Sequence, residues 1–257
     1  MLKFLYYKII SIIFNIGVFS RKYNIDIYYP YSKIKQYKDI HKGKRCFIIG
    51  TGPSLNIQDL ELLTDEYTFS MNSILLSFKD TKWRPTYYVV QDSRAYNIFK
   101  NKLLGQNIKE IFLGISYRRN SIFLNKFFNK NFNKYNYFPL KVFRDGIKNK
   151  NFSNDCYKQI YDGATVTYSI LQLALYMGFK EIYLLGIDCD YTTKGKKKNI
   201  IEYVKNTNTL ETERQMIEAY KIAKQYADTV NVKIYNTNLE GKLKVFPYKD
   251  INFILGE

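Results

Sequence analysis

The chain has 257 residues, enough for one domain with a sizeable hydrophobic core, and 40 lysine and arginine residues against 23 acidic ones give it a formal net charge of +17. This charge favours a phosphate-bearing substrate or an acidic membrane surface; no nucleic-acid partner is expected, because the basic residues are spread along the chain without a recognition helix, zinc knuckle or RNP motif. Three cysteines without metal-ligand spacing and one histidine, His41, exclude histidine-based zinc sites and, unless His41 itself serves, most histidine-dependent nucleophile triads.

We expect residues 1–40 to form a membrane-proximal segment and connector, ahead of a catalytic domain at residues 41–257. The apolar run that ends at Phe19 is too short, and too interrupted by Lys8 and Asn15, to predict a membrane span. It indicates either a helix that lies in an anionic membrane interface or a helix packed on the domain. Reduced cysteines indicate a cytoplasmic protein, so the first alternative predicts peripheral attachment to the inner face of the membrane.

The first strand and the glycine turn after it are the strongest motif of the chain. The apolar run Cys46–Ile49 predicts a buried parallel strand. Gly50 and Gly52 allow a sharp turn, Pro53 suits the first turn of a helix, and the N–H groups and dipole of a helix start bind phosphate. The alternative is a tight turn without a ligand. The predicted phosphate cradle consists of Gly50, Thr51, Gly52, Pro53 and Ser54.

Three further strands are expected at residues 67–71, 87–90 and 110–115, each separated from the next by enough chain for a crossover. This pattern predicts an α/β fold, a Rossmann-like, mostly parallel sheet with helices on both faces. Ligands bind such sheets beyond the carboxyl ends of the strands, although each polar residue there is singly more often a turn or cap residue. The candidates by this rule are Asn72, Gln91, Asp92 and Ser116.

Residues 117–160 interleave basic and aromatic side chains and interrupt the strand pattern. We expect an insertion here, either a lid that holds the acceptor or a solvated segment with some buried aromatics. The chain then returns to a helix from residue 166 that ends at Gly178, a strand at 180–185, a helix at 210–230 and a strand at 232–235. The start of the first of these helices is a second anion-binding candidate, formed by Thr165, Val166 and Thr167.

Two carboxylates follow the strand at 180–185, Asp188 and Asp190. Charges just past a buried strand need a partner or a cation. The pair is a candidate for Mg²⁺ or Mn²⁺ binding against a nucleotide diphosphate; alternatively one residue caps a helix and the other is a solvated turn residue.

Two stretches, Gly-Thr-Gly-Pro-Ser-Leu at 50–55 and Gly-Phe-Lys-Glu-Ile-Tyr-Leu-Leu-Gly-Ile-Asp at 178–188, resemble motifs of the bacterial sialyltransferases of glycosyltransferase family 42. They also resemble the related 6-hydroxymethylpterin diphosphokinase-like Rossmann domain of capsule and lipopolysaccharide gene clusters. The segments 83–89 and 234–247 resemble this second branch, and the likeness spans residues 42–250.

In the sialyltransferases the glycine loop and an asparagine after the second strand hold CMP, which the resemblance transfers to residues 50–54 and Asn72. It equates Gln91 with a further asparagine and places a phosphate-contacting tyrosine near Asp190 and Tyr191. The histidine base of that family has no equivalent between Tyr191 and Thr209. Three explanations are open: Asp188 or Asp190 acts as the base instead, the donor differs and has a metal-bound diphosphate as its leaving group, or the protein is inactive on sugars.

The resemblance implies a glycosyltransferase of surface polysaccharide, capsule or lipooligosaccharide synthesis, with CMP-sialic acid or a related CMP-sugar as donor and a glycan or lipid-linked acceptor. This first interpretation requires no cofactor. The alternatives are a Mg²⁺-dependent diphosphokinase-like transferase, with Asp188 and Asp190 at the metal, and a non-catalytic relative that binds a glycan or phosphate. Self-association into a homo-oligomer is left open.

Overall fold

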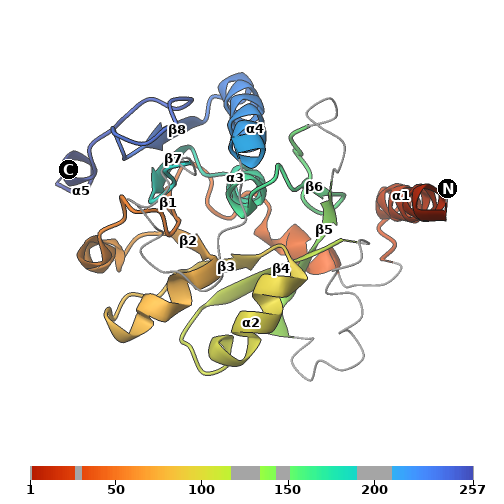
Figure 1. Cartoon of the computed structure of the whole chain (residues 1–257), viewed down its shortest axis with the longest axis horizontal. Helices are drawn as coiled ribbons and strands as arrows, with labels where there is room; N and C mark the ends of the chain where they lie inside the picture. Colours follow the sequence, from red (N-terminus) through yellow and green to blue (C-terminus); the bar gives the residue numbers. More distant parts are fainter. Residues whose placement is uncertain (1, 27–30, 117–133, 143–150, 190–209, 257) are drawn as a thin grey trace.

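The fold is a single eight-stranded parallel sheet with helices on both faces (Figure 1). The computed structural model describes residues 2–26, 31–116, 134–142, 151–189 and 210–256. The strand order is β6-β5-β4-β3-β2-β1-β7-β8. The strands are β1 (Arg45–Ile49), β2 (Thr68–Met71), β3 (Tyr87–Val90), β4 (Glu110–Ile115), β5 (Asn136–Lys141), β6 (Ile160–Tyr161), β7 (Glu181–Leu185) and β8 (Lys233–Asn236). The predicted Rossmann-like α/β class is confirmed, and all the strand pairs are parallel.

The order of the strands reverses at β1, which pairs with β2 on one side and with β7 on the other. Ile49 lies opposite Ser70 of β2 and Leu185 of β7, so the three strands end at the same level. At such a reversal the connections from two neighbouring strands run in opposite directions and leave a crevice between them. Ligands of this fold class bind in that crevice, beyond the carboxyl ends of the strands.

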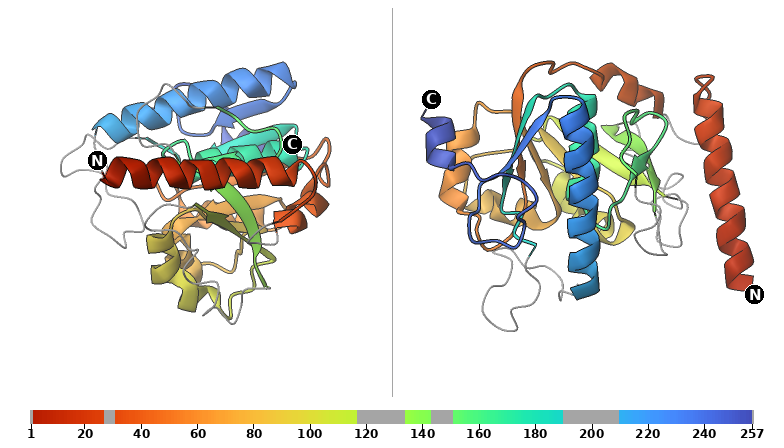
Figure 2. Two further views of the ribbon diagram at one scale, coloured as in Figure 1. Left: turned by 90° about the vertical axis from the view of Figure 1, so that its right-hand side faces the viewer. Right: turned by 90° about the horizontal axis from the view of Figure 1, so that it is seen from above.

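The helices form two layers (Figures 1 and 2). One face carries α3 (Val166–Tyr176) and α4 (Leu210–Thr229); the other carries η3 (Asn72–Lys79) and α2 (Ser93–Leu103). Helix α3 contacts β1, β2 and β3 on one side and α4 on the other. This position between two layers explains why ten of its eleven residues are buried. Besides α1 (Leu2–Arg21), the other helices of the described residues are η1 (Tyr31–Tyr37), which contacts β5, η2 (Ile57–Leu63) and α5 (Ile251–Leu255).

The predicted helix start at Pro53 is wrong. Residues 50–56 form a loop, and the first helical turn after β1 is the 3₁₀ helix η2, which begins at Ile57. Its cap is Asn56, whose side chain accepts a hydrogen bond of 3.3 Å from the Gln58 N–H. The glycine loop therefore lacks the helix dipole that the sequence interpretation assigned to it.

The predicted insertion at residues 117–160 contributes two strands to the sheet, β5 and β6. Residues 117–133 and 143–150 of the predicted lid lie outside the described residues. Pro139 hid β5, because a proline within a run argues against an interior strand. In the structure β6 pairs only with Leu140 and Lys141, so Pro139 lies where β5 has β4 alone as a neighbour.

Helix α1 (Leu2–Arg21) lies beyond the β6 end of the sheet, opposite the C-terminus (Figures 1 and 2). Phe14 and Arg21 are buried, and the Arg21 guanidinium donates to the Lys158 carbonyl oxygen at 2.7 Å. Among the described side chains of α1, the other face exposes large apolar groups at Leu5, Ile9, Ile12, Ile16 and Phe19. One side thus contacts the domain while the other faces solvent. No helix in the described part of the chain meets the length and hydropathy of a membrane span.

Candidate active site

The glycine loop after β1 is held by backbone hydrogen bonds to the end of β7. The Gly50 N–H donates to the Leu185 carbonyl oxygen at 2.8 Å, and the Gly52 N–H donates to that of Gly186 at 2.9 Å. A Cβ atom on Gly50 would lie 2.5 Å from the Gly186 carbonyl oxygen, and one on Gly52 would lie 2.5 Å from Asp188 Oδ2. The two glycines are therefore required by the contact between two loops of the protein.

The carboxylate of Asp188 connects the glycine loop to the segment after β8. Asp188 is buried, Oδ2 accepts the Ser54 N–H at 2.9 Å, and Oδ1 accepts the Ser54 hydroxyl. Asn238 Nδ2 also donates to Oδ1, at 2.6 Å. These three bonds supply the partners that a buried negative charge needs. Asp188 therefore has a structural function that the sequence interpretation did not foresee.

The catalytic and metal-binding functions of Asp188 and Asp190 stay predictions. A cation at Asp188 would have to compete with the donors from Ser54 and Asn238. Within the described residues no three histidine, cysteine or acidic side chains gather as a metal site. Asp190 and Tyr191 lie outside those residues.

The end of β2 has an unusual backbone. Asn72 has φ of +52°, in the left-handed region that asparagine tolerates better than other side chains. Its carbonyl oxygen accepts a hydrogen bond of 2.5 Å from the Tyr88 hydroxyl of β3, which fixes this geometry. Its side-chain amide is half-buried and, among the described residues, has no hydrogen-bond partner. A strained residue with an available amide at the end of a strand is typical of a binding site.

The start of α3 lies beside the end of β2. The Thr167 hydroxyl is 3.6 Å from Met71 Sδ, and the Thr165 side chain caps the helix by accepting the Thr167 N–H at 3.3 Å. The preceding Gly163 and Ala164 have φ of +49° and +63°. Asn72 and Ala164 thus place two strained, non-glycine backbones on the same edge of the sheet.

Gln91 and Asp92, after β3, have separate contacts. Ser169 of α3 donates its hydroxyl to Gln91 Oε1 at 2.8 Å, so the amide is oriented by the same helix. Asp92 is the N-cap of α2 and accepts the Ala95 N–H at 2.8 Å. Ser116, at the end of β4, is buried on the same edge, farther from β1.

His41, the one histidine that could have served as a base, and the thiol of Cys189 are both buried. His41 lies at the opposite, amino-terminal edge, where its Nε2 and the Tyr87 hydroxyl share a hydrogen bond of 2.5 Å and its ring stacks on Phe179. Burial, followed by the charges of Lys109 and Lys44, lowers its pKa below 6.5. Burial, with the charge of Asp188, raises the pKa of the Cys189 thiol to about 12, so the thiol is protonated at neutral pH.

Asn238 and Ser169 were missed by the sequence interpretation. Asn238 follows the last strand at the same edge, so the rule that selected Asn72 could have found it. Ser169 is in the interior of a helix, and no local signal distinguishes it from a core position. A cavity of about 90 Å³ lies between Ser54, Leu185 and Asn238. It is far smaller than the roughly 300 Å³ that a small-molecule site needs, so a nucleotide does not fit there.

Comparison with known proteins agrees with this fold. A family model described as 6-hydroxymethylpterin diphosphokinase MptE-like matches residues 23–194. The sialyltransferase CstII from Campylobacter jejuni, in complex with CMP-3FNeuAc, aligns at 17% identity with a TM-score of 0.49, over 81% of this chain and 87% of that chain. A variant of the same enzyme in complex with CMP gives a TM-score of 0.50 at 17% identity, with the same coverage.

The MAf glycosyltransferase from Magnetospirillum magneticum AMB-1 aligns at 14% identity with a TM-score of 0.45, over 89% of this chain and 38% of that chain. No protein of curated function matches the sequence. At 17% identity, the likeness to the CMP complex, which has the TM-score of 0.50, shows a shared fold alone.

Proposed function

The chain belongs to the 6-hydroxymethylpterin diphosphokinase MptE-like family, and on this premise we propose that it is a glycosyltransferase whose donor is a nucleotide-activated sugar, with a CMP-linked acid sugar as the first choice. One observation carries the proposal: the glycine loop, Asn72, Gln91 and the start of α3 converge at the edge where the strand order reverses. Solved structures of the same fold contain CMP and CMP-3FNeuAc, which supports the choice of nucleotide.

The donor phosphate is assigned to the start of α3. The Thr165 N–H donates to the Asp162 carbonyl oxygen at 2.9 Å, and the Thr167 N–H donates to the Thr165 hydroxyl oxygen at 3.3 Å. Within the described residues the Val166 N–H is therefore the donor of this turn that has no partner, and the helix dipole favours an anion there. The Asn72 amide supplies both a donor and an acceptor to the nucleoside, and Gln91, held by Ser169, supplies a second amide.

The reaction is a substitution at the anomeric carbon of the donor sugar. The acceptor hydroxyl oxygen forms a bond to that carbon, the bond from the carbon to the phosphate oxygen breaks, and CMP leaves as an anion that the start of α3 stabilises. A base takes the proton of the acceptor hydroxyl. Asp190 is our candidate, because His41 is at the opposite edge and the Asp188 carboxylate is bonded to Ser54 and Asn238.

Helix α1 supports a membrane location for this activity. Leu5, Ile9, Ile12, Ile16 and Phe19 recur at intervals of three and four residues on its exposed face. An exposed apolar stripe on a chain with a net charge of +17 suits an anionic lipid surface. The acceptor is accordingly proposed to be a glycan or lipid-linked saccharide of a bacterial surface polysaccharide, reached from the inner face of the membrane.

Isothermal titration calorimetry with CMP, UDP and GDP, each with and without Mn²⁺, tests the proposal. We expect binding of CMP that does not require the metal and weaker binding of UDP and GDP. Failure of every nucleotide to bind would contradict the glycosyltransferase function.

The family description supports a second candidate, a diphosphokinase-like transferase that uses ATP and Mg²⁺. Asp188 and Asp190 would then hold the metal. Binding of ATP that requires Mg²⁺, with release of AMP in the presence of a hydroxyl acceptor, would replace the first proposal with this one.

A further inference from the structure

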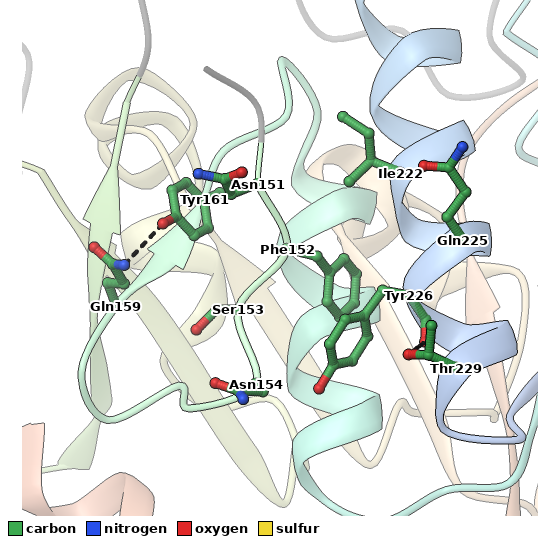
Figure 3. Close-up of a pocket in the computed structure, with 10 residues that line it drawn as sticks. All are labelled: Asn151, Phe152, Ser153, Asn154, Gln159, Tyr161, Ile222, Gln225, Tyr226 and Thr229. Atoms are coloured by element: carbon green, nitrogen blue, oxygen red, sulfur yellow. Dashed lines mark hydrogen bonds between the residues drawn. The ribbon is translucent and has the colours of Figure 1, made fainter. Parts of the chain in front are cut away.

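A second binding groove lies on the helical face of the molecule, beside α3. Its volume is about 500 Å³, within the range of small-molecule sites. One wall is the second half of α4, from Ile222 to Thr229, and the other is the segment 151–161 (Figure 3). The groove is distinct from the edge that carries the glycine loop.

The side chains that line the groove are polar but uncharged. Four are amides, from Asn151, Asn154, Gln159 and Gln225, and the rest are hydroxyl-bearing or apolar. Charged residues make up 25% of the chain, yet none of the described residues that line this groove is charged. The described lining offers amides and hydroxyl groups and no cation to pair with an anion, so it suits a neutral ligand with many hydroxyl groups.

An aromatic pair connects the two walls. The rings of Phe152 and Tyr226 stack with centroids 4.7 Å apart and planes at 21° (Figure 3). Phe152 also meets the ring of Tyr168 edge-on, at 5.6 Å. Flat apolar rings beside amides match a sugar, which has C–H faces and equatorial hydroxyls.

The segment 151–161 is held in place by one buried side chain of α3, that of Gln172. Gln172 Oε1 accepts the N–H groups of Ser153 and Tyr161, both at 3.0 Å, and its Nε2 donates to the Tyr161 carbonyl oxygen at 2.8 Å. A segment fixed by three bonds to a buried amide loses little freedom when a ligand binds.

We propose that this groove binds the neutral part of an oligosaccharide. If the proposed function holds, that saccharide is the acceptor, and the groove holds sugar units distant from the reacting hydroxyl. Ser169 makes the connection, because its hydroxyl contacts both Gln91 Oε1, at 2.8 Å, and the Tyr161 carbonyl oxygen, at 3.3 Å. Groove and donor site thus lie on two sides of the first turns of α3.

The test uses the full chain and a glycan array that contains both neutral and acidic oligosaccharides, followed by saturation-transfer NMR with lactose and N,N′-diacetylchitobiose. We expect neutral glycans to bind, and Gln225→Leu combined with Asn154→Ala to weaken binding about tenfold through the loss of two amides. Gln106→Ala, an amide in the loop after α2, is the matched control and should bind as the unaltered protein does. Tyr226→Ala should weaken the binding of neutral glycans more than the loss of the two amides does, because it removes one ring of the aromatic pair.

CMP titration of the same variants separates this inference from the proposed function. The Gln225→Leu, Asn154→Ala variant should bind CMP unchanged. If no neutral glycan binds, or if binding is equal in the groove variant, the inference is overturned whether or not CMP binds. If neutral glycans bind in the groove and no nucleotide binds, the carbohydrate site stands and the transferase proposal fails.

Discussion

The glycine loop and the start of α3 lie at the same edge of the sheet but use their hydrogen-bonding groups differently. The glycine loop is bonded to the protein itself: Gly50 and Gly52 donate to the end of β7, and Ser54 donates to Asp188. Beside the start of α3, by contrast, Asn72 at the end of β2 has a strained backbone and a side-chain amide that forms no hydrogen bond with any described residue. The more conspicuous motif therefore holds the fold, and the less conspicuous one is better suited to hold the ligand.

The largest effect is expected for Gly52→Ala. Its new methyl group would lie 2.5 Å from Asp188 Oδ2 and 2.6 Å from the Gly186 carbonyl oxygen, so two loops must separate. We expect a loss of about 3 kcal/mol in the free energy of unfolding, measured by urea denaturation. Thr51→Ala, at the neighbouring position, is the control and should change stability little. A stable Gly52→Ala protein that has lost only CMP binding would show that the loop serves the ligand instead.

Asp188→Asn tests whether the carboxylate holds the loops together. The replacement amide turns one oxygen acceptor into a donor, which then faces another donor from Ser54 or Asn238. We expect a loss of about 2 kcal/mol in the free energy of unfolding. Asn238→Ala should lose less, because it removes one of the three bonds. Unchanged stability combined with abolished turnover would instead identify Asp188 as a base or metal ligand.

The sequence predicted most of the sheet because its strands are short apolar runs that end in polar residues. It failed at β5, where Pro139 conceals a strand that pairs with β4 over four residues. It also failed after Pro53, where Leu60 and Leu63 fit both helix types: a spacing of three suits the 3₁₀ helix that the structure has.

The sequence predicted candidate site residues only where their position after a strand or at a helix start was enough to select them. The rule for carboxyl ends selected Asn72 and Gln91, and the structure places both beside α3. It could not show that Ser54 and Asp188, which are 134 residues apart, are hydrogen-bonded to each other and so have fewer groups available for a ligand. Such pairing is a property of the packed chain, and no spacing in the sequence encodes it.

Asn72→Gly tests whether the region beside the start of α3 binds the ligand, and its expected effect is smaller and falls on CMP affinity. Glycine keeps the left-handed backbone at φ of +52° without strain but removes the amide. We expect CMP to bind about tenfold more weakly, by calorimetry, with stability nearly unchanged. Asn231→Gly is a matched control, since that exposed asparagine has φ of +54° after α4 and is remote from the site. Equal CMP affinity in both variants would remove Asn72 from the binding site.

The smallest effect is expected for His41, which lies at the amino-terminal edge of the sheet, away from both the glycine loop and the start of α3. The pKa of His41 is lowered from 6.5 by burial, so the unfolded chain takes up its proton at a higher pH than the folded protein does. The folded state is then favoured above pH 6.5 and loses stability as the pH falls through that value. His41→Gln removes this dependence, and urea midpoints at pH 7.5 and 5.5 should differ less for the variant than for the unaltered protein.

The pH profile of turnover should stay the same, because the ring shares its hydrogen bond with Tyr87 at the far edge of the sheet. A turnover profile that shifts with this substitution would make His41 part of the catalytic machinery and would contradict the assignment of the reaction to the opposite edge.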